Sequence, residues 1–472
     1  MTVANDIINC RTPDFDAYVR AGESLDDIDE YGFTPLIECA ITRQTHIAEI
    51  LLEKKVDVNK PDVTGRTALH WAVDLNDMEM AELLLENGAD ANAYTSAGLS
   101  TLVYPVLRGQ DVLKQLLYDH GGVLDFALDF INGKSLGHRF ELQGDVDIVN
   151  GGGEFIELDY EGFILEFTVA MIKDSLRRFT SSFSTKHLRR HFTYMHAIMN
   201  TFGYASELLQ FQHHALSARD MVRLEYLLEE PMLILPAASK GHAISFVRFR
   251  RWWAKIDRGE NSLKEGSVNV YQIKRPQAFT TDFIMEFLYR KQSRRFFHED
   301  INHILGLEPV LQLPMSSQIS GNCSWANVQG VVPVAYALLQ LESGEPFSYD
   351  VVKELYSTWI EWDKDRALDE SIQRFHLANP TRKASYASML GSVLFQACDA
   401  SIDNNLARAE KILKILSLPE YTYILDSYID IYCVKRLTRK GNNLLKLLDD
   451  CGINPQIGVT AIATGLKPRE EK

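Results

Sequence analysis

The sequence is poor in cysteine and has no long apolar run. Its 472 residues include six cysteines, Cys10, Cys39, Cys323, Cys398, Cys433 and Cys451. They are scattered and form no C-x-x-C pair, which argues against a disulfide framework and against a structural zinc site. A reducing compartment is the natural interpretation. No stretch approaches the roughly 18 apolar residues of a membrane span.

An excess of basic charge is also missing. The net charge is −15, which argues against direct nucleic-acid binding. The N-terminal stretch MTVANDIINCRTPDFD contains acidic residues and no apolar core, so it is not a signal peptide. There is no P-loop and no G-x-G-x-x-G motif. His213 and His214 are adjacent and lack partners at ligand spacing, so we expect neither a metal nor a cofactor.

A 33-residue period marks the first part of the chain. Gly32, Gly65 and Gly98 stand in the stretches YGFTPLIECA, TGRTALHWAV and AGLSTLVYPV, and each stretch precedes a second helical pattern. A turn and two short helices with one apolar stripe cannot bury that stripe alone, so neighbouring units stack. These stretches resemble the ankyrin repeat. We predict an ankyrin segment over residues 1–130, with three clear repeats and a degenerate N-terminal cap.

Ankyrin repeats bind partner proteins through their hairpin tips and the adjoining groove, so the resemblance implies a protein partner. In the third tip the candidate contact residues are Tyr94, Thr95, Ser96 and Leu99. His70 belongs to the repeat signature, and we expect it to bond the neighbouring turn rather than to act in chemistry.

The middle of the chain has a different pattern. Residues 145–167 alternate apolar and polar residues around a Gly-Gly-Gly run, which favours a β-hairpin. Helical patterns cover about 168–230. Strand patterns follow at 232–237, 242–249, 252–259, 268–273 and 308–314, and a long helix is predicted over 280–305. We predict an α+β domain at 131–345 and a C-terminal helical region at 346–472, ankyrin-like near 439–455.

Two strand ends in this domain could form a catalytic pair. His242 opens one predicted strand and Asp257 closes the next, so a hairpin would make the two side chains neighbours. A carboxylate fixes the tautomer of an adjacent imidazole and stabilises its protonated form. His242 could instead be a strand-end histidine bonded to backbone. Asp257 could be a turn former, with Glu260 and Asn261 as rivals.

Cys323 would supply a nucleophile. The preceding Ser-Gly-Asn is a suitable helix start, with Ser320 or Asn322 as the cap. A helix N-terminus and a nearby protonated histidine both lower a thiol pKa. The Cys323 N–H and the Gln318 side chain could then bind an oxyanion. The alternatives are an inert buried thiol at Cys323, a solvated amide at Gln318, and Gln312 in its place. The helix after Cys323 contains Pro333, which we expect to kink it or end a turn.

The order His242, Asp257, Gln318, Cys323 resembles the adenain- and SUMO-protease-like cysteine peptidases, which include bacterial effector acetyltransferases. The resemblance covers about residues 230–345. Two positions depart from it: Ser324 stands where many members have Gly, and Asn322 where many have Asp. Either changes the oxyanion site, and a catalytically dead relative would show such changes.

The combination of ankyrin repeats with such a domain resembles the ankyrin-repeat effectors of Legionella. The fold class predicted is therefore α+β multidomain: an ankyrin solenoid, a cysteine-protease-like domain and a helical C-terminal region. The resemblance implies a bacterial protein, a monomer, that is delivered into a host cell; a cytoplasmic protein is the other interpretation. It implies a cysteine hydrolase acting on an amide or isopeptide bond. An acyltransferase and a non-enzymatic scaffold with a vestigial site remain alternatives.

Overall fold

The computed structural model describes residues 3–9, 11–162, 164–213, 216–239, 242–259, 265–290, 292–318, 321–344 and 347–453. These residues form two compact units. The first contains residues 1–131, 150–152 and 163–354, and the second contains 132–149, 153–162 and 355–472. The three segments predicted from the sequence are consecutive stretches of the chain. The two units are defined by contacts between residues, so each unit contains stretches that are far apart in the sequence.

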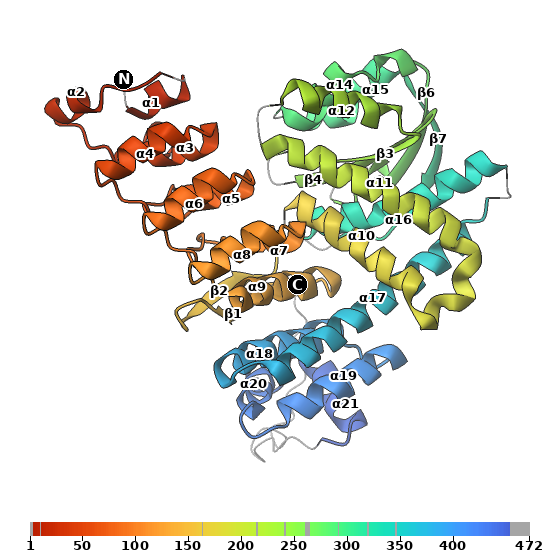
Figure 1. Ribbon diagram of the computed structural model, residues 1–472. Helices are drawn as coiled ribbons and strands as arrows, with labels where there is room; N and C mark the ends of the chain where they lie inside the picture. The colour runs from red at the N-terminus through yellow and green to blue at the C-terminus, as the bar shows by residue number, and fades with distance from the viewer. Residues whose placement is uncertain are drawn as a thin grey trace. The chain divides into compact units, whose positions relative to one another are not determined.

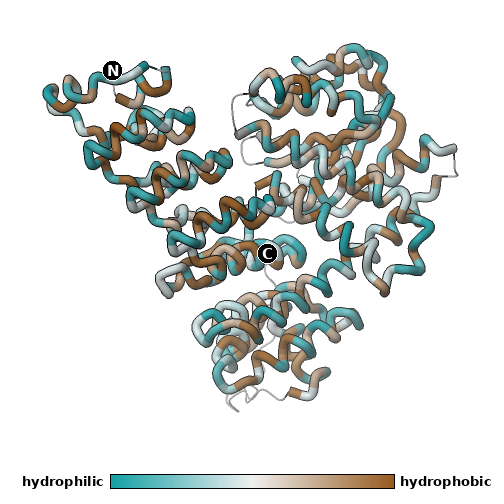
Figure 2. Tube along the Cα trace, viewed as in Figure 1, coloured by the Kyte–Doolittle hydropathy of each residue, from teal (hydrophilic) through white to brown (hydrophobic). Residues whose placement is uncertain are grey.

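The N-terminal part of the first unit consists of short paired helices, drawn in red to orange in Figure 1. They are α1 (Val3–Ile8), α2 (Phe15–Arg20), α3 (Pro35–Thr42), α4 (Thr45–Glu53), α5 (Ala68–Asp74), α6 (Met78–Glu86), α7 (Val103–Arg108) and α8 (Asp111–Asp119), followed by α9 (Leu124–Arg139), which continues into the second unit. In Figure 2 these helices alternate between hydrophobic and hydrophilic residues, as expected for helices with one buried side.

The turns between the repeats explain the 33-residue period. In two successive turns an aspartate accepts two backbone N–H groups, as Asp62 does from Thr64 at 2.8 Å and from Arg66 at 3.0 Å. The glycine in each turn has a positive φ, 86° at Gly65. A Cβ atom on Gly65 would lie 2.8 Å from the backbone nitrogen of Ser96 in the next turn. The period is therefore set by close stacking of consecutive turns.

A buried ion network joins the repeats to the helix that follows them in the same unit. Arg108 donates to both carboxylate oxygens of Glu166 at 2.9 Å, and its guanidinium also lies 3.0 Å from a carboxylate oxygen of Asp74. The three side chains are at most 7% exposed. Removing one partner would leave a buried charge uncompensated, so this network fixes the third repeat against α10 (Leu165–Ser181).

The rest of the first unit is built around a five-stranded antiparallel sheet in the order β3-β4-β5-β6-β7. The strands are β3 (Met232–Ser239), β4 (His242–Phe249), β5 (Trp252–Ile256), β6 (Val268–Ile273) and β7 (Leu307–Leu313). All five predicted strands are confirmed. Helices also occur where they were predicted, with α11 (Phe192–Gln210) and α12 (Ala218–Glu229) after α10, and the 3₁₀ segments η1 (Phe183–His191) and η2 (Phe211–His213) beside α11.

One face of the sheet carries an aromatic core. Phe246 and Trp253 pack there with rings of Phe283, Phe287 and Phe297. The last three come from α14 (Thr281–Tyr289) and the π-helical segment η4 (Phe296–Asp300). The short α15 (Ile301–Leu305) and the 3₁₀ turn η3 (Pro276–Ala278) complete this cover.

The long helix predicted over 280–305 is wrong. The chain leaves the helix at Arg290, whose backbone is extended (φ −111°, ψ 146°). It re-enters one at Arg294, directly after Ser293, whose hydroxyl accepts the Phe296 N–H at 3.2 Å. A side-chain hydrogen bond of this kind satisfies an unpaired N–H at the start of a new helix. The chain can therefore interrupt the helix here without leaving this N–H unsatisfied.

A buried helix lies against strands β4 and β5. This helix, α16 (Cys323–Ser343), also contacts α10 and α11, and nearly every residue from Ser324 to Leu338 is buried. Pro333 lies inside the helix, so of the two predicted outcomes, a kinked helix or the end of a turn, the second is wrong. An interior proline costs about 3 kcal/mol, and packing on all sides offsets this cost.

The described residues of the second unit are helical apart from one hairpin. The predicted hairpin is confirmed: β1 (Asp145–Val149) pairs with β2 (Phe155–Asp159). The helices are α17 (Tyr349–Leu377), which begins in the first unit, α18 (Pro380–Ala397), α19 (Asp403–Leu416), α20 (Thr422–Tyr428), the π-helical η5 (Ile429–Lys435) and α21 (Arg439–Asp450). The predicted α+β multidomain class is therefore confirmed.

Candidate functional site

Three of the predicted site residues lie together where β4 begins, β5 ends and α16 begins. His242 is the first residue of β4, Asp257 follows the last residue of β5, and Cys323 is the first residue of α16. The pairing of β4 with β5 brings Ser245 opposite Ile256, so continuing that register places His242 diagonally across from Asp257 on one face. We refer to Cys323, His242 and Asp257 as the Cys323 site.

The imidazole and the carboxylate are hydrogen-bonded. Nε2 of His242 lies 2.9 Å from Oδ1 of Asp257. The Asp257 side chain is 3% exposed and that of His242 is 15% exposed, so the carboxylate is buried and the imidazole is reachable. With Nε2 engaged, Nδ1 is the ring nitrogen that can face Cys323. Asp257 also accepts the Gly259 N–H at 3.0 Å.

The electrostatics favour an imidazolium beside a thiolate. The hydrogen bond to Asp257, together with one to Cys323, raises the pKa of His242 to about 9, although burial opposes this. Burial acts to raise the pKa of Cys323, but the hydrogen bond with His242, the Ala243 N–H and the charge of His242 outweigh it and hold this pKa below the usual value. The Ala243 nitrogen lies 3.4 Å from Sγ.

Cys323 differs from the other cysteines among the described residues. Burial raises the pKa of Cys398 to about 12 and that of Cys433 to about 11, and it raises the pKa of Cys39 still further. The pKa of Cys451 is also raised. A thiol reacts as its thiolate, so within the described part of the chain the conditions for a reactive thiol are met at Cys323.

Asp257 is a buried anion between two histidines. Burial would raise its pKa, but the hydrogen bond to His242, the Gly259 N–H and the charges of His242 and His298 hold it below the usual range. Nε2 of His298 lies 3.7 Å from the second carboxylate oxygen. The other ring nitrogen of His298 faces Glu265 at 3.3 Å, and Glu265 also pairs with Lys255 at 2.7 Å.

Sequence reasoning missed His298. The residue lies in η4, inside the stretch predicted as one continuous helix, where a histidine carries no strand-end or loop signal. The distance in sequence from Asp257 gave no hint of contact. Only the packing of η4 on the sheet face that bears Asp257 brings them together.

The backbone of Gln318 is hydrogen-bonded to the residue that follows Asp257. Its N–H donates to the carbonyl of Arg258 at 3.0 Å. Its side-chain oxygen is buried and makes no hydrogen bond to any described residue. The rival Gln312 is engaged elsewhere: it donates to the Glu265 carbonyl and to Asn269, at 3.1 and 2.9 Å.

The sequence also offered alternatives to Asp257 and two candidate caps for the helix that begins at Cys323. Glu260, Asn261 and Ser320 lie outside the described residues. Asn322 is the N-cap residue of α16, but its side chain makes no capping hydrogen bond. Cys323 is the first residue of α16, and its role as an oxyanion donor stays a prediction.

His70 and the third ankyrin tip are placed clearly. His70 is 3% exposed, and its Nε2 lies 3.3 Å from the Leu99 carbonyl, which confirms the predicted bond to the neighbouring turn. Of the four proposed contact residues, Thr95 and Leu99 are buried. The Thr95 hydroxyl accepts the N–H groups of Ala97 and Leu99 and so replaces the aspartate of the other turns. The other two of the four, Tyr94 and Ser96, are exposed.

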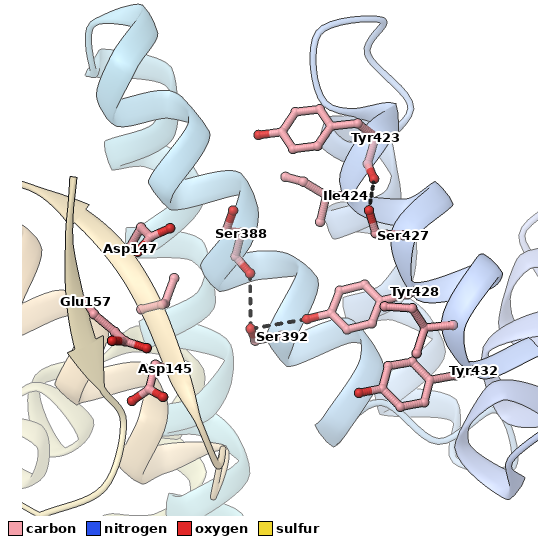
Figure 3. A pocket seen from close by; sticks show the side chains of 12 residues that line it. Asp145, Asp147, Glu157, Ser388, Ser392, Tyr423, Ile424, Ser427, Tyr428 and Tyr432 are labelled. Atoms are coloured by element: carbon pink, nitrogen blue, oxygen red, sulfur yellow. Dashed lines mark hydrogen bonds between the residues drawn. The ribbon is translucent and has the colours of Figure 1, made fainter. Parts of the chain in front are cut away.

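The second unit contains a cavity of about 420 Å³. Figure 3 shows carboxylates of the hairpin on one side and tyrosines of α20 and η5 on the other. Its lining consists of Asp145, Val146, Asp147, Glu157, Ser388, Ser392, Tyr423, Ile424, Ser427, Tyr428, Ile431 and Tyr432. None of these is a cysteine or a histidine, so the cavity does not offer the nucleophile and base found at the Cys323 site.

Known proteins share both the repeats and the whole fold. The ankyrin repeat family, in three copies, matches residues 13–95 and 62–127. A solved structure described as the Legionella effector AnkH is 69% identical to this chain, with a TM-score of 0.89, over 97% of this chain and 99% of the other.

The chain belongs to the AnkH family. The resemblance to Legionella ankyrin effectors is thereby confirmed, as is the presence of ankyrin repeats. No curated protein matches this AnkH-family chain. Within the described residues, no helix is both long enough and apolar enough to cross a membrane, and no group of three or more His, Cys, Asp or Glu side chains is arranged to hold a metal ion.

Proposed function

We propose that this AnkH-family chain is an effector that is delivered into a host cell, binds a host protein through its ankyrin repeats, and hydrolyses an amide or isopeptide bond with Cys323. The name of the 69% identical relative supports the first part, and the repeats support the second. The observation that carries the third is the His242–Asp257 contact at 2.9 Å combined with the hydrogen bond between His242 and Cys323.

The geometry supports the following reaction. The Cys323 thiolate attacks the carbonyl carbon, and the electron pair of the C=O bond moves to oxygen. The Cys323 N–H and the Gln318 amide stabilise this oxyanion. The imidazolium of His242 then gives its proton to the leaving nitrogen as the C–N bond breaks, which releases an amine and leaves a thioester. His242, now neutral, takes a proton from the water that attacks the thioester. The C–S bond then breaks, which releases a carboxylic acid and regenerates the Cys323 thiolate beside the His242 imidazolium.

Asp257 holds His242 in the orientation this reaction needs. A buried carboxylate on Nε2 fixes the ring and stabilises its protonated form. Because the carboxylate is itself stabilised by the Gly259 N–H and by His298, Asp257 stays ionised while His242 carries its proton.

The basic stretch on β4 and β5 does not favour the acyltransferase alternative. Acetyl-CoA binding there would use Arg248, Arg250, Arg251 or Lys255. The Arg251 guanidinium lies over the Trp252 ring, 4.9 Å from its centroid. The Arg248 side chain donates to the Glu230 carbonyl at 2.6 Å, Arg250 pairs with Glu342 at 2.7 Å, and Lys255 pairs with Glu265 at 2.7 Å. These cations are engaged within the protein, so hydrolysis is the function we propose.

A substrate analogue with a thiol-trapping electrophile at the scissile carbonyl tests the proposal. We expect it to label Cys323 in the unaltered chain and to label His242→Ala far more slowly. Equal labelling of the two proteins would contradict a histidine-activated thiol. Hydrolysis of amide or isopeptide bonds releases amines, so host-cell protein extract incubated with the active chain should gain free amino groups. Acetylated lysines that appear only when acetyl-CoA is added would instead identify an acyltransferase.

A further inference from the structure

Asn327 is a fully buried amide within an apolar helix. It is 0% exposed and stands four residues after Cys323 on α16. Residues four apart lie on the same side of a helix, one turn from each other. Asn327 therefore faces the same strand ends as Cys323.

Both polar groups of Asn327 are bonded to the backbone of the Cys323 site. Its Nδ2 donates to the Ala243 carbonyl at 2.6 Å, and its Oδ1 accepts the Arg258 N–H at 2.8 Å. Ala243 directly follows His242, and Arg258 directly follows Asp257. The partners also fix which end of the amide is which, because a carbonyl only accepts and an N–H only donates.

The two strand ends depend on Asn327 to different degrees. Arg258 has further anchors on the same elements, since its guanidinium donates to the Ser316 carbonyl at 2.8 Å and to the Ala326 carbonyl at 3.1 Å. The Ala243 carbonyl accepts from Asn327, while the Ala243 N–H points to the Cys323 sulfur. The start of β4, which carries His242, pairs with β3 on one side, and the hydrogen bonds of Ala243 to Asn327 and to the Cys323 sulfur link it to α16.

We propose that Asn327 is a positioning residue for the Cys323 site: it holds the backbone beside His242 and Asp257 against the helix that begins at Cys323, and so sets the contact between thiolate and imidazolium. This inference rests on the proposed function. Asn327 touches no reacting atom and acts through His242.

The test follows the pH dependence of Cys323 alkylation by iodoacetamide, measured on the peptide containing Cys323 after digestion of the full-length chain. In Asn327→Ala we expect the inflection to move up towards that of an ordinary thiol, and the rate at pH about 6 to fall at least about fivefold. The control is Gln340→Ala, a buried polar residue near the other end of α16, which should keep the profile of the unaltered chain.

A double substitution separates positioning from simple destabilisation. In the His242→Ala background the contact is already gone, so adding Asn327→Ala should change the alkylation rate less than about twofold. If Asn327→Ala does not fold, Asn327→Asp replaces it, since it keeps the acceptor for Arg258 and loses the donor to Ala243. The negative charge of the new aspartate would change the alkylation rate of Cys323 whether or not His242 is present. A loss of positioning would change this rate only when His242 is present.

The outcomes are distinguishable. An unchanged profile in Asn327→Ala, an equal shift in Gln340→Ala, or the same loss in both backgrounds overturns the positioning role and leaves the proposed function standing. If the unaltered chain and His242→Ala already share one profile, the proposed function fails, and the role of Asn327 falls with it.

Discussion

Gly259 limits how much room there is around the His242 ring. A Cβ atom at position 259 would lie 2.6 Å from Cε1 of His242 and 3.2 Å from Oδ1 of Asp257. Separations below 3.0 Å do not occur between packed carbons without displacement of one partner. A glycine next to the carboxylate is therefore part of how the imidazole is seated.

Gly259→Ala should displace the imidazole and weaken its contact with Cys323. We expect alkylation of Cys323 near neutral pH to slow by about tenfold, with little change in the far-ultraviolet circular dichroism spectrum. Gly203→Ala is the matched control, because its Cβ meets only the flexible end of Lys173. Identical alkylation rates for the two variants would show that the ring has room to spare.

The residues that the sequence revealed are those at element ends. His242, Asp257 and Cys323 could be predicted because a strand start, a strand end and a helix start each leave a local signal. His298 and Asn327 could not, because both lie inside helical patterns. An amide among valines and alanines has the signature of a core helix, and its partners, Ala243 and Arg258, are 84 and 69 residues away.

At the scale of elements, the ankyrin helix α3 contains an unusual buried acid. Burial, followed by the charge of Asp29 and a hydrogen bond with it, raises the pKa of Glu38 to about 7. The folded chain therefore holds a proton on Glu38 at pH values where the unfolded chain has lost it. The contribution of Glu38 to stability is most favourable below the unfolded pKa of about 4.5 and declines as the pH rises through about 7.

Glu38→Gln should remove this decline. We expect the variant to melt at a temperature a few degrees above the unaltered chain at pH about 8, with a smaller difference or a reversed one at pH about 5. Thermal unfolding followed by circular dichroism at both pH values measures this. Glu49→Gln, an exposed change on α4, should leave both curves in place. A Glu38→Gln difference that is the same at both pH values would refute the protonation argument.

Tertiary packing explains the two predictions about helices that were wrong. The proline in α16 and the broken helix between α14 and η4 both contradict local expectation. In each case the buried contacts, rather than local propensity, determine the path of the chain. The strands and the repeats were predictable because their periodicity and their burial agree.

At the scale of the whole molecule, the proposed function assigns recognition and chemistry to different parts of the first unit. The turns of successive repeats each expose an apolar side chain, Tyr31 at 63%, Val63 at 75% and Tyr94 at 39%. The Cys323 site lies at the ends of β4 and β5. The proposed function therefore predicts that partner binding and thiol reactivity can be lost separately.

Val63→Glu combined with Ser96→Glu should weaken capture of the host partner by at least about tenfold, while the alkylation profile of Cys323 stays unchanged. Cys323→Ser should do the reverse, with capture kept and cleavage lost. Val112→Glu, an exposed apolar position on α8 away from the turns, is the control for added charge. Loss of capture in Cys323→Ser would contradict the separation of the two functions.

The most direct test of the central claim is the pH dependence of Cys323 alkylation in the unaltered chain and in His242→Ala. Cys451, whose pKa is raised, serves as an internal reference in the same digest. Cys323 of the unaltered chain should react with an inflection below the ordinary thiol value of about 8.5. In His242→Ala this inflection should move up, because the hydrogen bond and the charge of His242 no longer oppose burial. Superimposable profiles, or an ordinary inflection in the unaltered chain, would contradict a thiolate held by His242.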